Sequence, residues 1–283
     1  MLRKTTRFRR SKLVKMTTPG DDGRSLISLV QGYGEEIPLA ESALLIAKVV
    51  DDSICIRSEL ESLDSLFAMA PTIAQQESPL ASANQLSEFL FDQQGFTGNH
   101  DNYYDPKNSL LNHVMRRKLG IPITLSLLLI EAGRRCGVPL IGVGMPGHFL
   151  VRHIADGSCY IDPFNRGLLI SQEECAEQFH KISPTVRWNP NFLQTVTNKA
   201  IITRILRNLA AIWSNSDEAT LAIQMLNLLV QLEPQVPGHL RDRGMLKYRT
   251  GDKANAETDL ESYLQLAQDA PDIWYVRRLL GHK

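Results

Sequence analysis

A histidine and an aspartate lie close together in the stretch GMPGHFLVRHIADGSCYIDPFNRG, residues 144–167. The apolar pattern predicts a β-hairpin with Asp156-Gly157 as its turn, His148 at the start of one strand and Asp162 at the end of the other. A histidine oriented by an aspartate is two thirds of a hydrolase triad. The open question is which residue would supply the nucleophile.

The pairing of His148 with Asp162 depends on the length of the hairpin loop. The two side chains share a face only if the loop has an odd length or a bulge intervenes. The four residues ADGS, taken as the loop, would separate them. The alternative role of the two residues is a structural hydrogen bond that pins the hairpin to a helix, because buried polar groups need partners.

Two hydroxyl side chains, Thr124 and Ser126, lie near the start of the apolar helix predicted over residues 121–136. A hydroxyl nucleophile needs a well-placed general base and an oxyanion hole. His148 could be that base, and Asp162 could fix its tautomer. Thr124 equally suits a cap at the start of the helix.

The four cysteines do not offer an obvious thiolate. Cys136 is at the far end of the 121–136 helix, about 20 Å from its start at 1.5 Å per residue. Cys159 has the opposite parity to Asp162, so we expect it to face the other side of the hairpin. Cys55 and Cys175 are distant in sequence, and no pattern directs them to the site.

The spacing of potential ligands predicts neither a metal ion nor a cofactor. No Cys/His cluster has zinc-ligand spacing. His148 and His153 are five residues apart, so they project from opposite faces of a strand and cannot share an ion there.

The elements around the hairpin predict an α+β fold. Helical patterns occupy most of the chain before residue 136, and strands follow up to about residue 186. We therefore expect a mostly helical domain with a small antiparallel sheet over residues 26–186. The segment NHDNYYDP, residues 99–106, could rim a pocket or be a loop that buries Tyr103 or Tyr104.

Residues 192–283 are predicted to be entirely helical and repetitive. Matching positions recur 34 residues apart, at Ala222 and Ala256, Leu226 and Leu260, Asp217 and Gly251, and Leu206 and Leu240. This period is typical of tetratricopeptide repeats, although two unrelated helical hairpins remain the alternative. Two repeats rarely stand alone, so we expect them to dock on the first domain or on a partner, with a terminal helix that caps them through Trp274, Val276 and Leu280.

Charge and hydropathy exclude some classes of partner. Lys+Arg and Asp+Glu balance at 31 each, which argues against nucleic acid and anionic membranes as partners. No apolar run approaches the roughly 20 residues of a membrane helix. Without a secretory signal, a reducing cytoplasm is expected. Residues 1–25 form a basic tail, expected to be disordered; a transit peptide, or initiation at Met16, are the alternatives.

A longer stretch is similar to a known family. The run GFTGNHDNYYDPKNSLLNHVMRRKLGIPITLSLLLIEAGRRCGVPLIGVGMPGHFLVR, the following YIDPFNRG, and LRDRGMLKYRTGD resemble the SirB-type bacterial proteins. These combine a transglutaminase-like core with tetratricopeptide repeats. The resemblance implies a Cys-His-Asp site, with the histidine at His148 and the aspartate at Asp162. The cysteine position falls at or near Pro122, and no thiol exists between residues 56 and 135.

The missing cysteine decides the functional expectation. We expect a non-catalytic module whose repeats bind a protein partner through their groove. The alternative is a hydrolase, amidase or acyl transferase that uses Thr124 or Ser126 with His148 and Asp162. Direct nucleic-acid binding is a third, weaker candidate, and the neutral charge counts against it.

Overall fold

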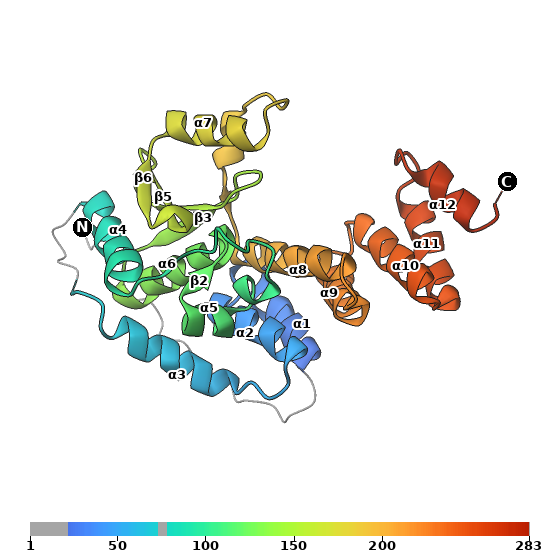
Figure 1. Cartoon of the computed structure of the whole chain (residues 1–283), viewed down its shortest axis with the longest axis horizontal. Helices are drawn as coiled ribbons and strands as arrows, with labels where there is room; N and C mark the ends of the chain where they lie inside the picture. The colour runs from blue at the N-terminus through green and yellow to red at the C-terminus, as the bar shows by residue number, and fades with distance from the viewer. Residues whose placement is uncertain (1–21, 73–77, 283) are drawn as a thin grey trace, which may run out of the picture.

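A computed structural model describes residues 22–72 and 78–282 of the chain (Figure 1). Most of the basic tail predicted over residues 1–25 lies outside the described residues. Helix α1 already begins at Asp22, inside that predicted tail. The helical layer before the sheet comprises α1 (Asp22–Tyr33), α2 (Leu39–Val50), α3 (Ile56–Phe67), α4 (Pro79–Glu88), α5 (Leu111–Arg117) and α6 (Pro122–Cys136).

Helix α6 is the central element of this layer. Pro122 occupies its first turn, where the missing N–H costs nothing, and Gly137 ends it in the left-handed conformation. Every residue from Pro122 to Gly133 is buried. A helix that is buried on all sides needs apolar side chains around its whole circumference, which explains the continuous apolar run in the sequence.

The sheet has five antiparallel strands in the order β6-β5-β4-β3-β7. These strands are β3 (Leu140–Val143), β4 (Leu150–His153), β5 (Tyr160–Asp162), β6 (Leu168–Ile170) and β7 (Thr195–Val196). The expectation that strands stop near residue 186 is wrong, because β7 pairs with β3 at the sheet edge. Two residues are too few to show a strand periodicity.

A second, parallel pair joins β1 (Thr97–Gly98) to β2 (Leu119–Gly120) beside the start of α6. Helix α5 ends at Arg117, and Lys118 adopts the left-handed conformation that redirects the chain into β2.

The two faces of the sheet pack against different helices. Val151 and Ile161 belong to the main core together with the residues of α6. On the other face, Leu150 and Tyr160 form a smaller cluster with residues of α7 (Gln172–Ile182). Helix α7 is fixed at its start by a reciprocal capping box between Ser171 and Glu174. This helix therefore covers the face opposite to α6.

The C-terminal helices form antiparallel pairs, as the 34-residue period predicted. They are α8 (Asn198–Ser214), α9 (Ala219–Leu232), α10 (Gly238–Thr250), α11 (Lys253–Leu266) and α12 (Ile273–Leu279). Ala222 and Ala256 are both fully buried. A Cβ added at Gly244 would lie 2.8 Å from Cγ of Leu260, so α10 and α11 approach too closely for a larger residue. Close helix crossings explain the small residues of the repeat.

The repeats divide between two cores. Helices α8 and α9 contribute Ile202, Leu206 and Leu229 to the main core that contains α2 and α6. The last three helices enclose a separate cluster around Leu260 and Val276, and they lie away from the sheet in Figure 1. The terminal helix α12 buries Val276, but Trp274 is 66% exposed, so the expectation that Trp274 helps to cap the repeats is wrong.

Candidate functional site

A tight turn between β3 and β4 presents His148. The backbone N–H of His148 donates to the carbonyl of Met145 at 3.0 Å. Pro146 is the second residue of the turn, and Gly147 is the third, with a positive φ of 76°. This is the residue pattern of a type II turn, in which glycine at the third position avoids steric strain. Strand β4 begins at Leu150, so His148 belongs to the turn and not to the strand.

Asp162 ends β5 and is completely buried. Its Oδ1 accepts the backbone N–H groups of Phe164 and Asn165, at 3.1 and 3.3 Å. Its Oδ2 accepts the side-chain amides of Asn165 at 2.8 Å and of Gln178, on α7, at 3.4 Å. The carboxylate therefore caps the short helix η4 (Pro163–Asn165) and also joins β5 to α7.

The structure brings His148 and Asp162 together. Nε2 of His148 lies 2.9 Å from Oδ1 of Asp162, although the ring is not aligned for a hydrogen bond from that nitrogen. Val151 pairs with Ile161, so an odd number of residues, 152–160, separates the paired positions. A four-residue loop does not form, and this register puts Leu150 and Asp162 on one face.

The surroundings of Asp162 keep it ionised. Burial by itself would raise the pKa of this carboxyl group. The imidazole of His148 and the hydrogen bonds from Asn165 outweigh burial and hold the pKa below its ordinary value. The pair can therefore act as a carboxylate that orients an imidazole, or as a buried polar tie between the turn and β5.

The two candidate hydroxyl groups have other surroundings. Thr124 Oγ1 donates to the carbonyl of Asn108 at 2.7 Å and accepts the N–H of Ile121 at 3.1 Å, so it acts as a helix-start cap. Ser126 Oγ is buried and has no hydrogen-bond partner within the described residues. Neither hydroxyl forms a hydrogen bond to His148 in the described part of the chain. Pro122, at the expected cysteine position, is buried at the start of α6.

One cysteine is closer to the pair than the sequence indicated. Cys175 is on α7, one turn before Gln178, and is fully buried. Burial and the negative charge of Asp162 raise the pKa of this thiol to about 12. A thiol with this pKa is neutral near pH 7, so it is a poor nucleophile.

Sequence reasoning missed several neighbours of the pair. Asn165 could have been found, because an aspartate followed by proline and, three residues later, asparagine is a local capping pattern. Gln178 and Arg204 come from α7 and α8, and no local signal connects them to the hairpin. Arg204 donates to the carbonyl of His148 at 2.9 Å, and its guanidinium lies 5.3 Å from the ring centroid of Phe149.

Potential metal ligands do not gather near this pair. Within residues 22–72 and 78–282, no group of three or more His, Cys, Asp or Glu side chains could hold a metal ion. Nδ1 of His153 accepts the N–H of Ala155 at 3.1 Å and so has a local role. In the same described ranges, no helix is long and apolar enough to cross a membrane.

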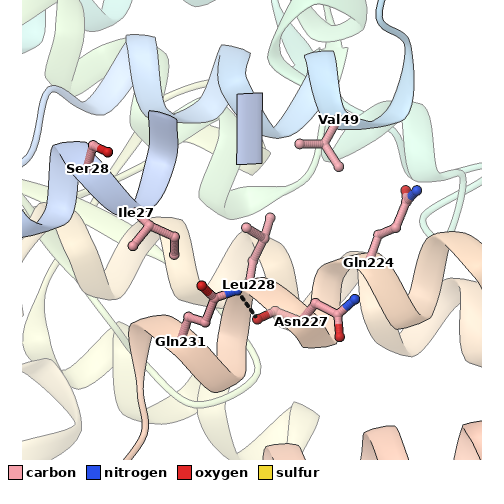
Figure 2. Close-up of a pocket in the computed structure, with 7 residues that line it drawn as sticks. All are labelled: Ile27, Ser28, Val49, Gln224, Asn227, Leu228 and Gln231. Atoms are coloured by element: carbon pink, nitrogen blue, oxygen red, sulfur yellow. Dashed lines mark hydrogen bonds between the residues drawn. The ribbon is translucent and has the colours of Figure 1, made fainter. Parts of the chain in front are cut away.

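A surface groove lies elsewhere, where the first repeat meets α1 and α2. Figure 2 shows the amide side chains of Gln224, Asn227 and Gln231 along α9 on one side. Ile27 and Ser28 of α1, Val49 of α2 and Leu228 of α9 complete the lining. None of these residues belongs to the His148 site, so the groove and the pair are separate features.

The sequence comparisons agree with this architecture. A model described as transglutaminase-like superfamily matches residues 56–207, and a tetratricopeptide-repeat model matches residues 207–281. The first match covers more than half of the chain and includes both His148 and Asp162. The chain belongs to the transglutaminase-like superfamily and continues into tetratricopeptide repeats.

Full-length relatives occur in several bacteria. A UPF0162 protein of Xylella fastidiosa strain Temecula1 is 37% identical, over 88% of this chain and 89% of its own length. A UPF0162 protein of Vibrio cholerae is 26% identical, over 87% and 92%. The human F-box only protein 21 is 40% identical over 30% of this chain and 15% of its own. The chain is thus similar to the bacterial proteins over most of its length, and to the human protein over one segment.

Proposed function

We propose that the chain is a non-catalytic, SirB-type member of the transglutaminase-like superfamily, whose repeats bind a partner protein in the cytoplasm. The observation that carries this proposal is the buried Pro122 at the position where the resemblance expects the cysteine. Without a thiolate, the retained histidine and aspartate have no nucleophile to activate. The repeats support the binding role, because stacked repeats form an extended surface that suits protein partners.

In this proposal, the contact between His148 and Asp162 is structural. Asp162 links η4, α7 and the His148 turn through one buried carboxylate. Removing one member of such a network leaves buried groups without partners, which is costly. This cost gives a reason, independent of catalysis, for both residues to be present.

An enzyme remains the second candidate because Nε2 of His148 lies 2.9 Å from Oδ1 of Asp162, close enough for a carboxylate to orient the imidazole of a general base. In this alternative, Thr124 or Ser126 would be the nucleophile of a hydrolase, amidase or acyl transferase. Both hydroxyl groups are buried, and neither is hydrogen-bonded to His148 among the described residues. Such an enzyme would therefore need α6 to move relative to the sheet.

A hydrolysis screen separates the two candidates. The wild-type chain and the His148→Ala variant are compared on a panel of esters, amides and peptides, after circular dichroism shows that both are folded. Equal background rates are expected, because no nucleophile is aligned with His148. A wild-type rate that falls by about 100-fold or more in the variant, the size of a general-base effect, would establish the enzyme instead.

A quantitative pull-down tests the binding role. Trp274 and Tyr275 are 66% and 46% exposed on α12, so Trp274→Ser with Tyr275→Ser leaves the core intact. We expect this double variant to lose partners that the wild type retains, since exposed tryptophan and tyrosine often dominate binding energy. The matched control is Tyr104→Ser, which alters an exposed aromatic residue before α5. An identical partner set for wild type, double variant and control would contradict the proposal.

A further inference from the structure

An arginine beside the His148 turn has no acidic partner among the described residues. Arg204, on α8, is half-buried, and its guanidinium donates only to backbone carbonyls. The bond to His148 is 2.9 Å, and those to Met145 are 3.4 and 3.5 Å. Burial lowers the pKa of Arg204, and the neighbouring charge of Arg207 lowers it further. A cation in such a position is stabilised when an anion joins it.

Two further polar groups lie around the same turn. The phenol of Tyr103 and Nδ1 of His148 have no hydrogen-bond partner in the described part of the chain. The two rings share one neighbour, because the centroid of Phe164 is 5.7 Å from that of Tyr103 and 6.2 Å from that of His148. Burial raises the pKa of the Tyr103 phenol, and the positive charge of Arg204 acts against that rise.

We propose that Arg204, Tyr103 and His148 form a binding site for an oxyanion, a carboxylate or a phosphate group, carried by a ligand of the transglutaminase-like domain. The fork of a guanidinium matches the two oxygens of either group. The ring of Phe149, 5.3 Å from the guanidinium, limits its rotation and so fixes the direction of its donors. The Tyr103 phenol supplies an additional donor, and Nδ1 of His148 supplies another when the imidazole is protonated.

This site is separate from the partner surface of the repeats, and it does not require catalysis. It also gives the loop of residues 99–108 a function. Asn108 holds that loop, because its side-chain amide donates to the carbonyls of Asn102 and Tyr103 at 2.8 and 3.2 Å. The loop therefore presents Tyr103 on a fixed backbone, as a preorganised binding site requires.

The test is a titration of the full chain by isothermal calorimetry with defined probes. The probes are inorganic phosphate, acetate, and a short peptide with either a free or an amidated C-terminus, each measured against chloride at equal ionic strength. Saturable binding of at least one oxyanion is expected. Binding of phosphate alone identifies a phosphate site, whereas binding of acetate and of the free but not the amidated peptide identifies a carboxylate site.

Three variants locate the binding. Arg204→Met is expected to weaken it at least about tenfold, as the loss of a charge-assisted pair does. Arg204→Met also removes the donor to the carbonyls of Met145 and His148, so a second variant that leaves these bonds in place is needed. Tyr103→Phe keeps the ring against Phe164 and should weaken binding about threefold to tenfold. Tyr104→Phe, at a side chain 75% exposed, is the matched control and should bind like wild type. The absence of saturable binding by every probe, or binding that Arg204→Met and Tyr103→Phe leave unchanged, overturns the proposal.

Discussion

At the scale of single residues, Asp162 combines complete burial with a full negative charge. Five polar contacts, from His148, Phe164, Gln178 and two groups of Asn165, surround its two oxygens. A buried charge is tolerated only when it is hydrogen-bonded in this way. The residue therefore contributes to folding whether or not the site binds or reacts.

The first prediction concerns the charge of Asp162. Asp162→Asn is expected to lower the free energy of unfolding by about 1–3 kcal/mol at pH 7, because an amide nitrogen would face donors. The folded pKa lies below the ordinary value of 3.8, so the charge stabilises the fold above about pH 4. The difference between wild type and variant should therefore shrink as the pH falls below about 4.

Urea unfolding at pH 3 to 7 measures this difference. The control is Asp101→Asn, which removes a carboxylate from the exposed loop. A pH-independent difference, or an equal effect in the control, would show that the buried charge is not the cause.

The second prediction concerns the cysteines. Cys55 is exposed, whereas Cys175 is buried with a pKa raised to about 12. We expect iodoacetamide at pH 8 to label Cys55 within minutes and Cys175 only after denaturation, because the thiolate is the reactive form. Peptide mass spectrometry over a time course gives both rates. Rapid labelling of Cys175 in the folded chain would mean that it has a depressed pKa and access to solvent.

The hairpin pattern and the family resemblance pointed to His148 and Asp162 as candidate residues, but did not specify how the two side chains meet. His148 and Asp162 are identified by resemblance and by position. Their shared face depends on a register that the loop sequence does not specify, because ADGS is compatible with more than one loop length. Cys175 and Gln178 arrive through the packing of α7, and no separation in sequence encodes that contact.

At the scale of elements, the turn from Met145 to His148 is the part of the hairpin with the least freedom. Gly147 has a positive φ, and a Cβ at this position would lie 2.6 Å from Cγ2 of Ile182. Both the backbone and the contact with α7 therefore require glycine.

The third prediction follows from this turn. Gly147→Ala is expected to destabilise the fold by about 1–3 kcal/mol, as strain of this kind does, and to disturb the His148 contact. Gly157→Ala is the matched control, because its nearest non-neighbouring atom is 3.8 Å away and its φ is ordinary. Thermal unfolding of both variants tests this prediction. Equal unfolding midpoints for Gly147→Ala and Gly157→Ala would refute the role of the turn.

The elements that the sequence predicted well are the long ones. The central helix was placed from its apolar run, and the repeats from their 34-residue period. The pairs β1–β2 and β3–β7 were missed, since strands of two residues carry no alternation. Their existence depends on the chain returning to a sheet edge, which is a tertiary event.

At the scale of the whole molecule, the boundary between the two segments does not separate their cores. Ile202 and Leu206 of α8 are fully buried in the core of the transglutaminase-like domain. The first repeat is therefore part of the folding unit of that domain, and α10 to α12 extend from it.

The fourth prediction tests this division. A chain that ends at residue 236 should unfold cooperatively, because it keeps α8 and α9 in the main core. A chain that ends at residue 191 should expose the apolar surface that α8 covers and should aggregate or lose its cooperative transition. Scanning calorimetry measures the unfolding transition of the two shortened chains, and the fluorescence of a dye that binds apolar surface measures how much of that surface each exposes. A cooperative transition in the shorter chain would show that α8 is dispensable.

Helix α8 also connects two sites that have been described separately. It carries Arg204 at the His148 turn, and along its length it packs against α9, the helix on which α10 rests. Any shift of α8 that a partner induces through the repeats moves the guanidinium relative to the turn. Thermodynamic linkage then requires the two effects to be equal. If a repeat-bound partner changes the affinity for the oxyanion by some factor, the oxyanion changes the affinity for the partner by the same factor. Under the two proposals made above, α8 is shared by two binding surfaces, and a ligand that shifts this helix would be an effector of the other ligand.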